Sequence, residues 1–378
     1  MRQSGRGQVD PFIVMDVMEA ARQAEAQGRH IIHMEVGQPA TPAPKGARDV
    51  LARALEQPLG YTVALGLPEL RQGIARLYER WYGVDLDPAR VVVTSGSSGA
   101  FILAFSALFD AGDRVALGAP GYPSYRQIMR AMSLRPVAIP TILENRFQPR
   151  AQDIPADVQG LMLASPGNPS GTMLGLDELR ALIARAQSQG TAVISDEIYH
   201  GLSYGEQAHS GLEVTDEVFV INSFSKYFSM TGWRIGWMVV PESHLRSVER
   251  LAQNLFICPP HASQIAALAA LDCESEAQAN LATYAENRRL MLEGLPKAGF
   301  DHIAPPDGAF YIYADVSGLT DDSVALAAEI LDRVGVAVTP GVDFDADHGH
   351  RMLRFSYARS TAEIAEGLAR LQDFMARR

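Results

Sequence analysis

Cysteine is scarce in this sequence, which holds only Cys258 and Cys273 among its 378 residues. Two cysteines cannot build the disulfide framework of a small secreted protein, so free thiols in a reducing compartment are the simpler interpretation. Long apolar stretches are also missing, because runs such as Ala100–Phe109 are too short to cross a bilayer. The polar N-terminus, MRQSGRGQVD, lacks the apolar stretch of a secretory signal. We therefore expect a cytoplasmic protein that makes no use of a membrane.

Basic residues are in the minority, with 33 Lys and Arg against 44 Asp and Glu and a formal net charge of -11. A broad surface for nucleic acid or anionic membranes is therefore not expected, although local basic sites could still take small anions. The composition, 47% hydrophobic and 20% charged, is that of an ordinary globular protein. The length suffices for one large core and a smaller lobe.

Compact apolar segments alternate with helical lengths between residues 45 and 275. This pattern predicts the α/β class, with a large domain whose mainly parallel central sheet is flanked by helices. The expected strands are Val91–Thr94, Arg114–Leu117, Arg135–Ile139, Gly160–Ala164, Ala192–Ser195 and Val218–Asn222. Ligands of such sheets collect at the carboxyl ends of the strands.

The two ends of the chain have a different texture. Asp10 and Pro11 predict the start of a helix that Gly28 ends, followed by a strand over His30–Val36. Beyond residue 275 the pattern predicts a smaller α+β domain, with a long helix over Glu276–Leu295, a strand over Phe310–Asp315, a helix over Ser323–Val334 and a strand over Met352–Ser356. We assign residues 1–44 to an N-terminal arm and part of this small domain, 45–275 to the large domain, and 276–378 to the small C-terminal domain.

Three sequence features suggest chemistry at the edge of the predicted sheet. The first is the strand Val91–Thr94, which runs into a Gly/Ser turn with Ser97 and Ser98 and then into a helix. Free N–H groups at a helix start suit a phosphate, but a plain capped helix is an equally good interpretation. The turn matches neither the dinucleotide fingerprint nor the P-loop.

The second feature is Asp196, which ends the apolar strand of TAVISDEIY. A buried carboxylate needs a cation or hydrogen-bond donors, and a protonated pyridine nitrogen would serve. A helix N-cap is the common alternative.

The third feature is Lys226, which lies beyond another apolar strand with Ser223, Ser225 and Arg234 nearby. A lysine among other cations can react as a free amine, while an exposed loop lysine is the simpler alternative.

Together these segments resemble the class I/II aminotransferases of the pyridoxal 5′-phosphate (PLP) enzymes of fold type I. SFSKYFSMTGWRIGW at Ser223–Trp237 is similar to the family's lysine signature, and DEIY at Asp196–Tyr199 to its cofactor-nitrogen motif. SPGNPSG at Ser165–Gly171 resembles its asparagine turn, and GYTVALGLPELR at Gly60–Arg71 its N-terminal tyrosine segment. The resemblance spans nearly the whole chain, with the motifs in the family's order.

The resemblance implies a role for each matching residue. Lys226 would carry PLP as an internal aldimine and move the proton at the substrate Cα. Asp196 would pair with the pyridine nitrogen, Asn168 and Tyr199 would donate to the phenolic oxygen, and Tyr122 would stack on the ring. The phosphate would be held by Ser97, Ser98, Ser223, Ser225 and Arg234. Tyr61 would reach the phosphate of a neighbouring subunit, which implies a homodimer with shared sites. No metal site is implied.

The substrate α-carboxylate requires a further cation. RMLRFSYA at Arg351–Ala358 resembles the family's C-terminal arginine strand, and alternation from Phe355 favours Arg354 over Arg351 as the bidentate clamp. Asn168 and the amide of Gly37 would assist it. No second arginine can be placed for a dicarboxylic side chain, so a neutral or aromatic amino donor is a reasonable expectation. The oxo-acid acceptor, 2-oxoglutarate or pyruvate, stays open.

Three functions compete on this scaffold. The leading one is a ping-pong aminotransferase, which moves the amino group of an L-amino acid to a 2-oxo acid through Lys226. A PLP-dependent β-lyase of the cysteine-S-conjugate type is the alternative, because both reactions begin by removing the Cα proton. A ligand-sensing regulatory domain is the third, although about 40 residues before the large domain leave no room for a DNA-binding region. Tyr227 and Phe228 predict a bulky aromatic wall beside the lysine, and His200 is interpreted as a structural histidine.

Overall fold

Seven strands form the central sheet of the computed structural model, which describes residues 1–378. They are β2 (Val91–Thr94), β3 (Arg114–Ala119), β4 (Arg135–Pro140), β5 (Gly160–Ala164), β6 (Ala192–Asp196), β7 (Phe219–Ser223) and β8 (Gly236–Val239). Their order across the sheet is β2-β8-β7-β6-β5-β3-β4. All neighbours pair in parallel except β8, which is antiparallel to both β7 and β2. The predicted mainly parallel sheet is confirmed, and β8 is a strand that the sequence pattern did not indicate.

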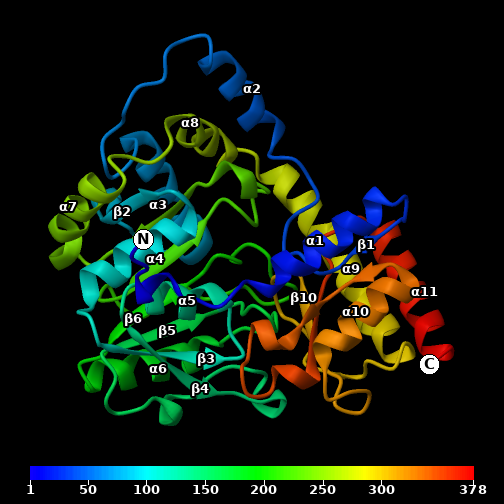
Figure 1. Ribbon diagram of the computed structural model, residues 1–378. Coiled ribbons are helices and arrows are strands. Elements are labelled where there is room, and N and C mark those ends of the chain that lie inside the picture. Colours follow the sequence, from blue (N-terminus) through cyan, green and yellow to red (C-terminus); the bar gives the residue numbers. More distant parts are fainter.

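Helices cover both faces of this sheet (Figure 1). Successive strand residues point to opposite faces, so Val91 and Val93 pack in one hydrophobic cluster and Val92 in another. The cluster around Val92 is covered by α4 (Gly96–Leu108), α5 (Pro123–Ala131) and α7 (Leu245–Leu255). The opposite face is covered by α3 (Pro68–Tyr82), α6 (Leu176–Ser188) and α8 (His261–Ala270), and α2 (Lys45–Ala54) packs on α8. This burial on both faces explains why the strands lack strict polar alternation.

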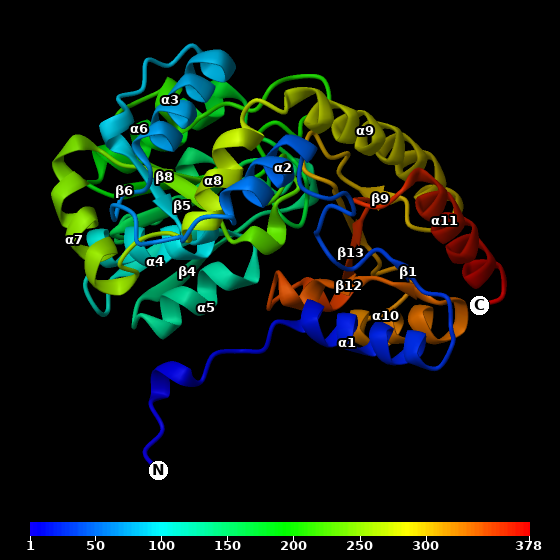
Figure 2. The same cartoon turned by 90° about the horizontal axis from the view of Figure 1, so that it is seen from above.

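The C-terminal part of the chain carries its own antiparallel sheet. Its strands run in the order β12 (Thr339–Pro340), β13 (Met352–Ser356), β10 (Tyr311–Asp315) and β9 (His302–Ile303). The helices here are α9 (Glu274–Lys297), α10 (Ser323–Val334) and α11 (Thr361–Ala376). The N-terminal segment joins them, since β1 (Ile32–His33) pairs in parallel with β11 (Val336–Ala337). Figure 2 shows α1 (Ile13–Ala26) lying beside α10.

Two predictions near the N-terminus need correction. The helix α1 begins at Ile13 rather than behind Asp10, and the predicted strand over His30–Val36 shrinks to β1. Asp10 forms an ion pair with Arg130 instead of capping the helix. The Asp343 carboxylate takes over the cap, accepting hydrogen bonds from the amides of Ile13 at 3.1 Å and Val14 at 3.2 Å. No helix in the structure has both the length and the apolar character required to span a membrane.

Candidate active site

A cavity of about 370 Å³ opens where the carboxyl ends of the parallel strands meet the C-terminal sheet. Its walls include Ser97 and Ser98 at the start of α4, Asp196 at the end of β6, and Arg354 on β13. Lys226 lines it from the connection between the antiparallel strands β7 and β8. The topology therefore brings together residues as distant in the chain as Ser97 and Arg354, as the rule for ligand sites in parallel sheets predicts.

The amino group of Lys226 lies inside this cavity and donates a hydrogen bond to the Gly37 carbonyl oxygen at 2.6 Å. Burial, together with the positive charges of Arg354 and Arg234, lowers the pKa of Lys226 to about 8, while the charge of Asp196 opposes this shift. At this pKa roughly a tenth of the amine is unprotonated near neutral pH, far more than for an ordinary lysine, and a nucleophilic amine requires the unprotonated form.

Asp196 is buried and directs its carboxylate into the same cavity. One carboxylate oxygen accepts a hydrogen bond from the Tyr125 hydroxyl, and the other accepts one from the Ile198 amide at 3.1 Å. Burial raises the pKa of Asp196 to about 6, although these bonds and the charge of Lys226 oppose the rise. A cation placed against this carboxylate would restore its charged form.

A cradle for an anion lies at the start of α4. Ser97, Ser98, Ser225 and Arg234 all line the cavity there. Gly96 has a φ of 71°, and a Cβ at this position would lie 2.4 Å from Nη2 of Arg234, so only glycine lets the guanidinium approach the helix start. Helix amides, hydroxyls and a guanidinium are the donors that bind phosphate.

Arg354 occupies the opposite wall and is 3% exposed. Its Nη1 donates to Oδ1 of Asn168 at 2.9 Å, and its Nη2 donates to the Thr339 hydroxyl at 3.2 Å. The guanidinium also lies over the Tyr311 ring, 4.5 Å from the centroid. Arg351, by contrast, is outside the cavity and forms an exposed ion pair with Asp321 at 2.7 Å. The Arg354 side chain thus points into the cavity, as the alternation of side chains along its strand indicated.

Gly37 and Tyr199 complete this side of the cavity. The Tyr199 hydroxyl is 2.8 Å from the Tyr311 hydroxyl. A Cβ on Gly37 would stand 1.6 Å from that same Tyr311 oxygen, so glycine is required for Tyr311 to approach. Tyr122 also lines the cavity, with its ring edge-on to Phe12 and Tyr125 at centroid distances of 5.8 and 5.2 Å.

Comparison with known proteins places this geometry in a family. The family model for aminotransferases of class I and II matches residues 29–371. The valine–pyruvate aminotransferase of Mycobacterium tuberculosis is 46% identical over 98% of this chain and 97% of its own length. The chain belongs to the class I and II aminotransferases.

Solved structures agree with this assignment. The protein in a crystal structure from Silicibacter pomeroyi, described as a putative aminotransferase, is 67% identical to this chain, with a TM-score of 0.96 over 100% of both chains. The aspartate aminotransferase from Thermus thermophilus with maleate is 31% identical, with a TM-score of 0.91 over 99% of this chain and 100% of that one. The protein is a PLP-family amino-acid aminotransferase of fold type I, and the names of its relatives do not favour the β-lyase alternative.

The cavity of this aminotransferase fits the cofactor that its family uses. A buried carboxylate without a cationic partner, a cradle of donors that a Cβ on Gly96 would fill, and a buried amine lie around one space. The carboxylate suits the pyridine nitrogen of PLP, the donors suit its phosphate, and the amine suits its aldehyde carbon.

Two of the predicted cofactor residues lie outside the cavity lining. Ser223 is buried, and its hydroxyl donates to the Ile235 carbonyl at 3.0 Å and accepts from the Ser225 amide at 3.0 Å. Tyr61 is 83% exposed on the surface of the single chain. The aromatic wall predicted beside the lysine is wrong, because Tyr227 and Phe228 point into the core, against Trp81 and Phe224.

Sequence reasoning missed several residues of the cavity. Tyr125 is the hydrogen-bond partner of Asp196, and it lies in the first turn of α5, three positions after the N-cap residue Tyr122, with the two rings edge to face at 5.2 Å. That spacing was a usable signal. Phe12, Met15 and Met18 also line the cavity, but nothing local to them indicates that α1 closes over the sheet edge.

Proposed function

We propose that Lys226, Asp196 and the cradle around Arg234 hold PLP in this aminotransferase. The bound cofactor would supply an electron sink that acidifies the substrate Cα. Asp196 would keep the ring nitrogen protonated, and Ser97, Ser98, Ser225 and Arg234 would bind the phosphate, with Ser223 holding Ser225 in place. Tyr122 would stack on the ring. Nζ of Lys226 would take the proton from the substrate Cα and return it, a role that its lowered pKa supports.

Asn168 and Tyr199 would donate hydrogen bonds to the phenolic oxygen of the cofactor. Such donation competes for the negative charge that would otherwise hold a proton on the neighbouring Lys226 nitrogen. It therefore lowers the pH at which this nitrogen loses its proton in the loaded enzyme. Asn168 would also join Arg354 and the Gly37 amide in binding the substrate α-carboxylate, consistent with its contact to Arg354.

The amino donor is proposed to be a neutral aliphatic amino acid, and the acceptor a small monocarboxylic oxo acid. One observation carries this proposal. The cations lining the cavity of the chain are Lys226, Arg234 and Arg354, and each already has a partner in the cofactor or the α-carboxylate. The wall contributed by the N-terminal segment is apolar, with Phe12, Val14, Met15 and Met18. A second carboxylate would be buried there without a cation, which is costly.

A donor and acceptor panel tests this specificity. We expect kcat/KM for valine with pyruvate to exceed that for aspartate with 2-oxoglutarate by about 100-fold, or ~3 kcal/mol of transition-state binding. Met18→Arg is the matched variant, because it adds a cation to the apolar wall. It should lower the preference for valine with pyruvate over aspartate with 2-oxoglutarate by at least about tenfold. Equal or better turnover of aspartate by the wild-type enzyme would contradict the proposal.

The working form is proposed to be a homodimer with shared sites. Six apolar side chains between 38% and 83% exposed lie in two segments: Leu55, Leu59, Tyr61, Val63, Leu255 and Ile257. The two segments are adjacent, because the Thr62 amide contacts Cys258 Sγ at 3.4 Å and His261 Nδ1 is 3.0 Å from the Gly60 carbonyl. An apolar surface of this kind is typical of an interface between subunits. Tyr61 lies within it, as a residue that reaches a neighbouring phosphate would.

Charge placed on this surface should separate the subunits. We expect Val63→Glu to convert the dimer to a monomer in analytical ultracentrifugation and to weaken PLP retention, because a carboxylate would be buried at an apolar interface. Val324→Glu is the matched control, since Val324 on α10 is similarly exposed, at 47% against 56%, but lies outside this surface. A wild-type protein that sediments as a monomer would refute the dimer.

Two coarser features complete the proposal. Residues 1–44 would join 276–378 in a small domain, with 45–275 forming the large one. The pairing of β1 with β11 supports this division. A cytoplasmic location is supported by Cys258 and Cys273, which are both free thiols in the folded chain.

A further inference from the structure

A second cluster of polar groups is buried directly behind Asp196. Whereas Asp196 faces the cavity, the next residue, Glu197, turns into the core and is 1% exposed. Its Oε1 accepts hydrogen bonds from the Ser195 hydroxyl at 3.0 Å and the Gly211 amide at 2.8 Å. Its Oε2 has no hydrogen-bond partner and lies 3.6 Å from Nδ1 of His200. None of these groups has a role in the chemistry described above.

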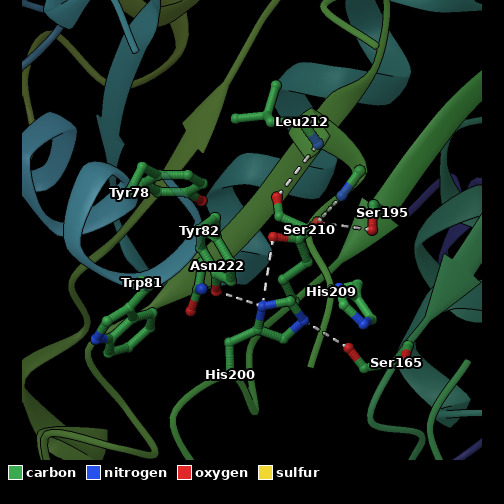
Figure 3. A network of polar contacts seen from close by, with 12 residues as sticks. Tyr78, Trp81, Tyr82, Ser165, Ser195, His200, His209, Ser210, Leu212 and Asn222 are labelled. Carbon is green, nitrogen blue, oxygen red and sulfur yellow. Dashed lines mark hydrogen bonds and ion pairs between the residues drawn. The ribbon is translucent and has the colours of Figure 1, made fainter. Parts of the chain in front are cut away.

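His200 lies at the centre of this cluster, with its ring between Tyr82 and Ser165 (Figure 3). The ring is 1% exposed, and Nε2 is 2.8 Å from the Ser165 carbonyl oxygen. A carbonyl can only accept, so Nε2 carries a hydrogen. Nδ1 is 2.6 Å from the Tyr82 hydroxyl and accepts a hydrogen bond from it, which is consistent with this tautomer.

Both members of the buried acid–base pair are uncharged at neutral pH. Burial lowers the pKa of His200 to about 3, although its bond to Ser165 opposes this shift. Burial raises the pKa of Glu197 to about 8, against the opposing bonds from Gly211 and Ser195. The neutral ring therefore keeps one donor and one acceptor, each with a single fixed partner.

Ser165 connects this cluster to the cavity. It begins the turn Ser165–Gly171, which carries Asn168. Its amide donates to the Asp196 carbonyl at 3.3 Å, and its hydroxyl accepts from the Leu174 amide at 2.9 Å. The bond from His200 completes the set of contacts that hold the start of the turn. Three residues later, Asn168 accepts from Arg354 at 2.9 Å inside the cavity.

We propose that His200 is a positioning residue of the active site, which sets the direction of the Asn168 side chain through its hydrogen bond to the Ser165 carbonyl. The inference rests on the proposed contact of Asn168 with the cofactor. His200 is absent from the cavity lining, so it acts on the site only through Ser165. Tyr82 acts indirectly: its hydroxyl donates to Nδ1 of His200, and the hydrogen of the ring therefore stays on Nε2.

The test is a pH titration of the visible absorption band of the PLP-loaded enzyme. His200→Leu removes the donor to Ser165, and we expect the midpoint of this titration to rise by about one pH unit, since Asn168 is no longer aligned to donate to the phenolic oxygen. His200→Gln should restore the wild-type midpoint, because its amide nitrogen stands as many bonds from Cβ as Nε2 does. Thermal unfolding is measured in parallel, since a merely structural role would lower the melting temperature without moving the midpoint.

Two further variants make every outcome decisive. Tyr82→Phe keeps the His200 ring but removes the hydroxyl that favours a hydrogen on Nε2, so we expect a smaller rise in the midpoint. If His200→Leu does not fold, the midpoint of Tyr82→Phe tests the proposal. Asn168→Ala should raise the midpoint at least as far as His200→Leu does. If Asn168→Ala raises it and neither His200→Leu nor Tyr82→Phe does, the positioning role is refuted while the proposed cofactor contact stands. If Asn168→Ala leaves it unmoved, the contact itself is wrong and the role of His200 falls with it.

Discussion

Replacing Lys226 by alanine is expected to abolish the visible absorption band that arises from the lysine–cofactor Schiff base and to reduce turnover on the order of 10⁴-fold or more. Nζ of Lys226 is the amine inside the cavity, and burial together with Arg354 and Arg234 lowers its pKa to about 8. Alanine removes both the attachment point of the cofactor and the group that moves the proton at Cα. Absorption spectra and steady-state kinetics measure the two losses separately.

The chain offers matched controls for this variant, because its only other lysines are Lys45 and Lys297. Both are exposed, and Lys45→Ala and Lys297→Ala should retain the spectrum and the activity. Borohydride reduction followed by peptide mapping should find the cofactor on Lys226 alone. A label on either other lysine, or an unchanged spectrum in Lys226→Ala, would refute the assignment.

Replacing Asp196 by alanine is expected to weaken PLP retention by roughly 10²- to 10³-fold and to cripple turnover. The reason is that breaking a buried pair of charges costs about 3–5 kcal/mol. In the chain alone, burial raises the pKa of Asp196 to about 6, which shows how strongly this site disfavours an isolated carboxylate. A protonated ring nitrogen would supply the missing charge. Cofactor release on dialysis and kcat measure the effect.

Tyr125→Phe is the graded comparison for Asp196→Ala. It keeps the carboxylate and removes only the hydroxyl that donates to it, so we expect a smaller loss of PLP retention, within about tenfold. Normal turnover and normal PLP retention in Asp196→Ala would remove the assigned role. A loss in Tyr125→Phe as large as that in Asp196→Ala would mean that the hydrogen bond, rather than the charge, holds the cofactor.

Local sequence patterns predicted the regular elements well where adjacent residues decide them. The helix over Ser323–Val334 and the strands over Val91–Thr94 and Met352–Ser356 have the predicted bounds. An N-cap, an apolar period or a strand alternation depends on residues within one or two turns, so it can be read from the chain. The same holds for Arg354, whose inward direction follows from the alternation along its own strand.

Contacts between distant segments escaped the same reasoning. The Asp343 cap on α1 joins residues about 330 positions apart, and the strand β8 is defined by its partners on either side. Tyr227 and Phe228 looked like a cavity wall because they follow Lys226, yet the turn directs them into the core. Such outcomes depend on which surfaces meet in the folded chain, and no local pattern records them.

The feature that the sequence by itself determined is the reaction. Lys226, Asp196, Asn168 and Arg234 each occur in a local motif whose residue types suit one part of the cofactor, and the family match agrees with that interpretation. Tertiary structure alone decided the walls and supports of the site: the apolar cover from α1, the Tyr125 bond to Asp196, and the link from His200 through Ser165 to Asn168. The physical reason is that a motif specifies the groups that do chemistry, whereas specificity and alignment come from side chains that meet only when the sheet edge, α1 and the C-terminal strands pack together.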